Sequence, residues 1–191
     1  MGRHIQYLAG FASQRTCDRR LRMLADNGYL TRHRVLYGVP NVYMLTRKSK
    51  TLIYANKRQD KIRLDQIMHD VTVLDVAICF MRSLGLTGAD IKTEKQLHQQ
   101  GGFGTRTHHP DFIFTKSNKT YCVEVELSLK SKARLEKNIK SNFSKYDVQI
   151  WVTDENGTKL SRILEGFKLP YANIEITNVK EIKNNVYKFY T

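Results

Sequence analysis

Charge divides this chain into two parts of different character. Residues 1–63 have 14 of the 32 Lys and Arg residues but only 3 of the 18 Asp and Glu residues. Residues 64–191 have the other 18 basic and 15 acidic residues, so their net charge is only +3. A chain of 191 residues is long enough for two small domains with separate cores. The charge distribution therefore predicts domains over 1–60 and 64–191, with a polar linker at 55–63, and the first domain is suited to a polyanion.

Composition excludes several classes of protein. The hydrophobic fraction of 41% is typical of a folded chain rather than a disordered one. Cys17, Cys79 and Cys122 are far apart and have no metal-binding spacing, so we expect reduced thiols that pack as small core residues. The longest apolar run, over 71–81, is too short to span a membrane, and the first residues lack the apolar core of a signal peptide. We therefore expect a soluble, cytoplasmic protein with no membrane partner.

The first 28 residues predict two short helices. Gly10 ends a helical stretch over 3–9, and Ser13 is a suitable N-cap for a second helix. Gly28 is a typical C-terminal stop for that helix. Its apolar residues fall on one side at helical spacing, opposite a row of arginines. These apolar residues are Cys17, Leu21 and Leu24.

A basic hairpin follows, because two β-rich runs at 29–37 and 42–46 flank a turn at 38–41. This order is that of a winged helix-turn-helix, whose second helix enters the major groove of DNA while the hairpin contacts phosphates. We expect the second helix and the hairpin to contact double-stranded DNA through Gln14, Arg15, Thr16, Arg19, Arg22, Arg32, Arg34 and Lys48. The alternative is a merely solvated basic helix face. Such modules often bind palindromic DNA as dimers, which leaves a homodimer open.

The second domain has the pattern of an α/β or α+β fold, a mixed sheet flanked by helices. Helical spacing covers 64–84, 131–146 and 160–167. Alternating or continuous apolar runs predict strands at 111–115, 120–129, 148–153 and 173–179. Residues 91–97 fit a strand or the start of a loop, and 99–110 are predicted as loop, including His108 and His109.

The hairpin over 111–129 brings carboxylates together. If Ser117 and Asn118 form a two-residue turn, Asp111 lies directly opposite Glu124. Like charges that face each other across a hairpin destabilise it, unless a cation bridges them or one is protonated. The alternative is a longer turn and a polar face that is simply solvated.

These carboxylates predict a metal site. Asp111, Glu124 and Glu126 would be the ligands, because Mg²⁺ prefers hard oxygen donors. A metal there would polarise a phosphate and lower the pKa of an attacking water. Lys130, Lys132 or Lys137, just downstream, could stabilise the attacking water or the developing negative charge, and Lys130 is the first of them along the chain.

Several stretches together resemble the replication-relaxation family of plasmids and integrative elements. They are TCDRRLRMLADNGYL, YGVPNVYMLT, HDVTVLDVAI, HPDFIF and VEVELSLKSKARLEKNI. The resemblance implies a winged helix fused to a domain similar to the PD-(D/E)xK restriction-endonuclease-like nucleases. It also implies mobile-element DNA as the target and other replication or transfer proteins as partners. Pro110-Asp111 then corresponds to the PD element and Glu124 to Glu126 to the (D/E)xK element, with Glu126 in place of lysine.

Three hypotheses follow. The first is a DNA-binding protein of a mobile element that acts in plasmid replication, relaxation or transfer. The second is a Mg²⁺-dependent endonuclease that nicks or cleaves DNA with Asp111, Glu124, Glu126 and Lys130. The third is an adaptor with no DNA contact, whose affinity for its partner would hardly depend on salt.

Overall fold

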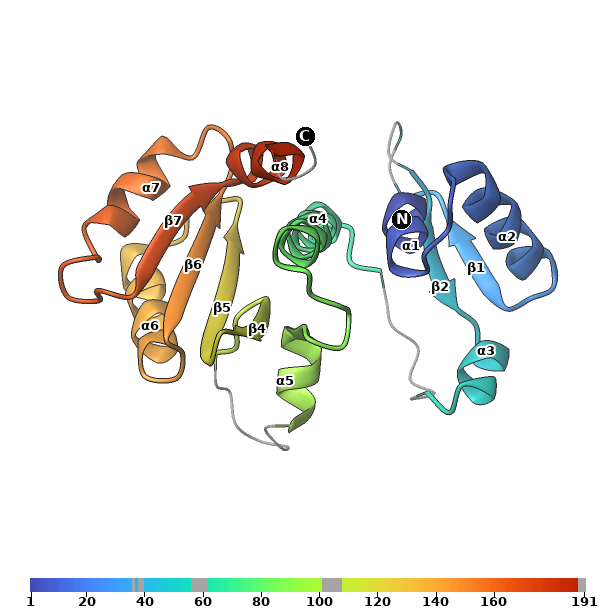
Figure 1. Cartoon of the computed structure of the whole chain (residues 1–191), viewed down its shortest axis with the longest axis horizontal. Helices are drawn as coiled ribbons and strands as arrows, with labels where there is room; N and C mark the ends of the chain where they lie inside the picture. The colour runs from blue at the N-terminus through green and yellow to red at the C-terminus, as the bar shows by residue number, and fades with distance from the viewer. Residues whose placement is uncertain (36, 38–39, 56–61, 101–107, 189–191) are drawn as a thin grey trace. The chain divides into compact units, whose positions relative to one another are not determined.

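The structure is a computed structural model that describes residues 1–35, 37, 40–55, 62–100 and 108–188 (Figure 1). The chain divides into two compact units, Met1–Val71 and Thr72–Thr191. Most of the predicted linker at 55–63, and part of the predicted turn at 38–41, lie outside the described residues.

The first unit contains three helices and a two-stranded sheet within its described part. Its elements are α1 (Gly2–Leu8), α2 (Gln14–Asp26), β1 (Leu30–His33), β2 (Val42–Leu45) and α3 (Arg47–Leu52). The strands pair antiparallel, with Leu30 opposite Leu45. The first two helices and the strand pair were predicted, whereas α3 was not, because its sequence RKSKTL has no apolar spacing.

Local chemistry fixes the ends of α2. The Ser13 side chain accepts a hydrogen bond from the Thr16 backbone N–H at 3.2 Å, as an N-cap does. Gly28, just past the helix, has a φ of +72°, which is the left-handed conformation that favours glycine. Cys17 and Leu21 are buried and Leu24 is half-buried, so the predicted apolar side of α2 is confirmed.

The second unit is built on a mixed five-stranded sheet with the order β3-β4-β5-β6-β7. The strands are β3 (Lys92–Thr93), β4 (Phe112–Lys116), β5 (Lys119–Glu126), β6 (Val148–Thr153) and β7 (Ile174–Asn178). The first three pair antiparallel and the last three parallel. The helices are α4 (Ile67–Leu84), which begins in the first unit, α5 (Glu94–Gln100), α6 (Lys132–Phe143), α7 (Thr158–Glu165) and α8 (Val179–Lys188).

The predicted mixed α/β architecture is confirmed, with two differences. Helix α5 occupies residues for which a strand or loop was predicted, and α8 was not predicted at all. The side chain of Asn178 accepts from the Glu181 N–H, while Glu181 accepts from the Asn178 N–H. This reciprocal pair is a capping box, a start signal that the sequence contains and our prediction overlooked.

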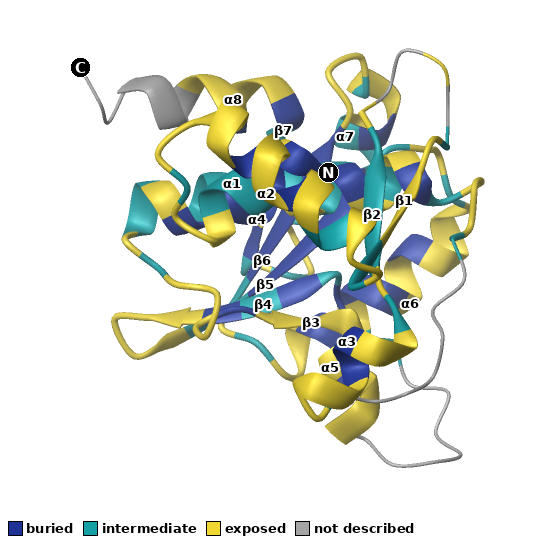
Figure 2. Cartoon of the chain, turned by 90° about the vertical axis from the view of Figure 1, so that its right-hand side faces the viewer, coloured by how far each residue is buried: buried dark blue, intermediate teal, exposed yellow. Residues whose placement is uncertain are grey.

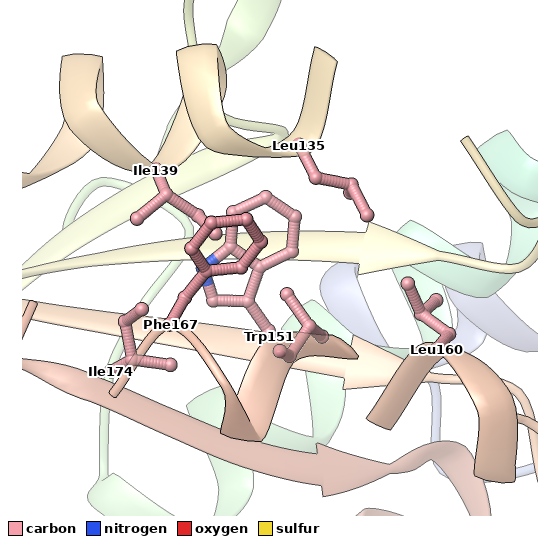
Figure 3. Packing of buried hydrophobic residues seen from close by; sticks show 7 residues of the cluster. Leu135, Ile139, Trp151, Leu160, Phe167 and Ile174 are labelled. Atoms are coloured by element: carbon pink, nitrogen blue, oxygen red, sulfur yellow. The ribbon is translucent and has the colours of Figure 1, made fainter. Parts of the chain in front are cut away.

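Helices cover both faces of the sheet (Figure 1). On one face, Phe80 of α4 packs against Phe112 and Phe114 of β4, with ring centroids 6.2 and 5.5 Å apart. On the other face, α6 and α7 enclose the fully buried Trp151 together with Leu135, Ile139, Leu160, Leu164, Phe167 and Ile174 (Figure 3). Strands β5 and β6 are therefore buried on both faces (Figure 2). Within the described residues, no helix is long and apolar enough to span a membrane.

Candidate nucleic-acid interface and carboxylate cluster

The buried side of α2 packs against α1. The thiol of Cys17 donates a hydrogen bond to the Gly2 carbonyl at a sulfur–oxygen distance of 3.6 Å. The packing leaves little room, because a Cβ on Gly2 would lie 2.9 Å from the Gln14 side-chain nitrogen. Helix α1 therefore fixes which side of α2 faces outward.

All eight predicted DNA contacts are exposed: Gln14, Arg15, Thr16, Arg19, Arg22, Arg32, Arg34 and Lys48. Thr16 also shares a hydrogen bond with Ser13 at 3.0 Å, so its hydroxyl belongs partly to the N-cap of α2.

Gln14 and Lys48 have partners within the protein. Gln14 Nε2 donates to Asp18 Oδ1 at 2.7 Å, one helical turn along α2. Lys48 Nζ donates to the Asn27 carbonyl at 3.2 Å and lies 4.1 Å from the centre of the Tyr29 ring. Lys48 thus ties the start of α3 to the end of α2, a role that the count of basic residues did not reveal.

Tyr43 marks the junction between α2 and the strand pair. It lies directly opposite Arg32 in the β1–β2 register. Burial raises the pKa of the Tyr43 phenol, the Asp18 carboxylate raises it further, and the positive charges of Arg32 and Arg22 lower it. Arg22 of α2 and Arg32 of β1 therefore both act on the pKa of the same tyrosine.

The predicted hairpin register is confirmed in the second unit. Lys116 pairs with Lys119, and Ser117 and Asn118 between them have φ values of 49° and 60°. These left-handed conformations are those of a type I′ two-residue turn. Phe112 pairs with Val123, so the next position along the hairpin sets Asp111 across from Glu124.

Protein donors hold both of these carboxylates. Asp111 Oδ2 accepts from the Val125 backbone N–H at 2.7 Å. Glu124 Oε1 accepts from Asn142 Nδ2 of α6 at 2.8 Å and lies 2.5 Å from His108 Nε2. The Glu124 side chain is only 8% exposed. Its carboxylate therefore lies inside a hydrogen-bonded cluster and not on an open polar face.

The third predicted ligand, Glu126, is paired elsewhere. Its carboxylate forms a salt bridge with Lys130 and is also within 3.5 Å of the Ser128 hydroxyl. Glu126 is buried, and the ammonium of Lys130, four residues further along the chain, neutralises it. Lys130 is therefore paired with Glu126, whereas the predicted catalytic role would need its ammonium beside a phosphate.

The residues described do not fit a three-carboxylate Mg²⁺ site. No group of three or more His, Cys, Asp or Glu side chains with metal-binding geometry exists within 1–35, 37, 40–55, 62–100 and 108–188. Glu126 already uses both of its oxygens within the protein, Oε1 near the Ser128 hydroxyl and Oε2 with the Lys130 ammonium, so a divalent cation there would compete with Lys130. The metal site stays a prediction that this geometry does not support.

Burial shifts the pKa of several titratable groups around the Glu124 cluster. Burial raises the pKa of the Cys122 thiol well above its ordinary value, and the nearby Glu124 carboxylate adds to the rise. Burial also raises the pKa of Tyr146, with Cys122 and Glu124 as further causes. The pKa of His109 is lowered by burial first and then by neighbouring His98 and Lys145.

Sequence reasoning missed two members of this cluster. His108 lies in a loop as predicted, but its contact with Glu124 was not predicted. Asn142 is fully buried on the apolar side of α6, and a polar residue at that spacing was the available signal. Comparison of the chain with family models, with curated proteins and with solved structures finds no match.

Proposed function

We propose that the Met1–Val71 unit binds double-stranded DNA as a winged helix-turn-helix. Helix α2 would enter the major groove, and the β1–β2 pair would lie along the phosphate backbone. Arg15 and Arg19 are suited to base edges or phosphates near the helix start, and Arg22 and Arg32 to the backbone. The resemblance noted in the sequence suggests replication, relaxation or transfer of a mobile element as the context.

The single observation that supports this function best is the exposed arginine surface around α2. Arg15, Arg19, Arg22 and Arg32 are all exposed, and within the described part of the chain none of them forms a salt bridge. Pairing exposed charges such as these contributes little to folding, and leaving them unpaired in solvent keeps them available for phosphates. Asp18, the nearest acid on α2, is already hydrogen-bonded to Gln14.

Fluorescence anisotropy of a labelled duplex tests the proposal on the full chain. Affinity should fall steeply between about 50 and about 200 mM salt, because bound arginines release counterions from DNA. The double variant R19Q/R22Q should bind about tenfold to 100-fold more weakly and lower the salt slope by about two. The matched control R47Q/R63Q removes two other exposed charges of the same unit and should change affinity little. A wild-type affinity that is insensitive to salt would favour a protein adaptor instead.

A second candidate function, endonuclease activity of the Thr72–Thr191 unit, rests on the opposition of Asp111 and Glu124. Plasmid nicking in Mg²⁺ tests it with the near-isosteric variants D111N and E124Q, which keep hydrogen-bonding capacity. Nicking by the wild type that both variants abolish would establish this function. No nicking at millimolar Mg²⁺ would leave DNA binding as the activity of the chain.

A further inference from the structure

The net charge of the second unit lies in one segment. Thr72–Thr191 has 18 basic and 13 acidic residues. Residues 130–145 alone have six of the basic residues and one of the acidic residues. The rest of the unit is balanced, with 12 of each, so its whole excess of positive charge belongs to α6 and its flanks.

Helix α6 separates its charged side chains from its buried ones. Its inner side is buried and consists of Leu135, Asn138, Ile139 and Asn142. The α6 basic face is the exposed side, made of Arg134, Lys137, Lys140 and Lys145. Ser141 lies in the same row, and its hydroxyl accepts a hydrogen bond from Lys145 Nζ at 3.3 Å. Glu136 is the one acidic residue of the helix.

This arrangement is unfavourable for the helix itself. The first turn of α6 contains Lys132 and Arg134 and no acidic residue, although the positive end of the helix dipole favours carboxylates there. Arg134, Lys137 and Lys140 follow one another at a spacing of three residues, where like charges repel. Among the described residues, none of these three forms a salt bridge. A charge distribution that opposes these helix preferences without a gain for folding is expected at a functional surface.

We propose that the α6 basic face binds the phosphate backbone of duplex DNA, as a second contact in addition to that of the first unit. The inference rests on the proposed function, because it assigns the same ligand to both units. An anionic membrane is the weaker candidate, since a helix that lies on a membrane needs an outward apolar side. The apolar residues Leu135 and Ile139 are instead enclosed in the core (Figure 3), and the partly exposed Phe143 packs its ring against that of Tyr171, with centroids 5.3 Å apart.

The test compares two triple variants of the full chain with equal changes in charge. R134Q/K137Q/K140Q removes three of the four charges of the α6 basic face, whereas K159Q/K180Q/K183Q neutralises three exposed lysines on α7 and α8. Binding of a labelled duplex is measured by anisotropy over a salt series. The α6 variant should lower the salt slope by about two to three and weaken binding at least tenfold, because each phosphate contact contributes about 0.9 to that slope. The control should change affinity less than about threefold, through net charge alone.

The outcomes separate this inference from the proposed function. If both triple variants lose affinity equally, or neither does, while R19Q/R22Q still binds weakly, the α6 contact is wrong and the first unit remains the DNA-binding part. If the α6 variant loses affinity and R19Q/R22Q does not, the α6 contact stands and the proposed role of the first unit is wrong. If the α6 variant loses binding to phosphatidylserine vesicles but keeps full affinity for DNA, the inference is overturned in favour of a membrane surface.

Discussion

The arginines of the first unit and the carboxylates of the second unit meet solvent in opposite ways. Arg15, Arg19 and Arg22 are exposed along α2. Glu124 and Glu126 are buried at 6% and 4% exposure, and each has a donor within the protein. Both groups of charges looked functional in the sequence, yet the first group is exposed to solvent and the second is engaged in contacts within the protein.

Burial decides whether a charged side chain serves the fold or is available to a ligand. A buried carboxylate must be paired, because an unpaired charge inside a protein is strongly unfavourable. Glu124 with Asn142 and Glu126 with Lys130 satisfy that requirement, which makes them part of the core. An exposed arginine contributes little to folding, so its presence in a cluster needs another reason.

The largest expected effect is that of E124A on stability. The substitution leaves the buried Asn142 amide and His108 without their acceptor and creates a cavity, which should cost about 3 kcal/mol of unfolding free energy. Trp151 is the single tryptophan, is fully buried and pairs with Glu124 across β5 and β6. Urea unfolding followed by its fluorescence therefore measures the second unit.

E124Q is the matched control for that experiment. Glutamine keeps an acceptor oxygen for Asn142, so it should lose clearly less stability than alanine. An E124A protein as stable as the wild type, or more stable, would show that the carboxylate is under strain in the fold. The contrast between the two units would then fail, and a ligand role for Glu124 would gain support.

K130A should have the next largest effect. It leaves the Glu126 carboxylate buried without its cation, which should cost about 2 kcal/mol. K137A removes an exposed lysine from the same region and should change the free energy of unfolding by less than about 0.5 kcal/mol. Equal stability of both variants in urea unfolding would mean that the salt bridge of Glu126 contributes nothing to the fold.

Much of the second unit could be predicted because its signals are local. The turn at Ser117 and Asn118 fixes the hairpin register, and the period of two along β4 separates Phe112 and Phe114 from Asp111. The run VQIWVT predicted β6 at its observed bounds, 148–153. Such patterns depend on residues within one or two elements, so the sequence states them directly.

The surroundings of Glu124 could not be predicted because they depend on distant elements. A hairpin considered alone has one buried and one solvated face. In the structure β6 pairs parallel with β5, and α6 covers the side on which Glu124 lies. Helix α5 was missed for a related reason: EKQLHQQ has a single apolar residue, Leu97, so it has no helical apolar spacing.

R15Q tests the opposite expectation in the first unit, that an exposed arginine contributes to binding and not to folding. Arg15 is exposed and has no salt bridge among the described residues, so R15Q should change the free energy of unfolding by less than about 0.5 kcal/mol. The same variant should bind duplex DNA a few-fold more weakly, since one contact is lost. Circular dichroism gives the stability and anisotropy the affinity. A large loss of stability with unchanged affinity would assign Arg15 to the fold.

The smallest effect concerns Asp90, an exposed carboxylate that nevertheless serves the fold. Asp90 Oδ2 accepts from both the backbone N–H and the hydroxyl of Thr87 at 2.7 Å, and these bonds lower the pKa of Asp90 below its ordinary value. A carboxyl with a lowered pKa in the folded state stabilises it above the ordinary pKa of the group, and that contribution is lost as the pH falls through the lowered value. The stability difference between wild type and D90N should therefore be present at neutral pH and disappear in acid. An NMR titration of the Asp90 carboxyl carbon measures the pKa directly, and an unshifted midpoint would show that Thr87 does not hold it in solution.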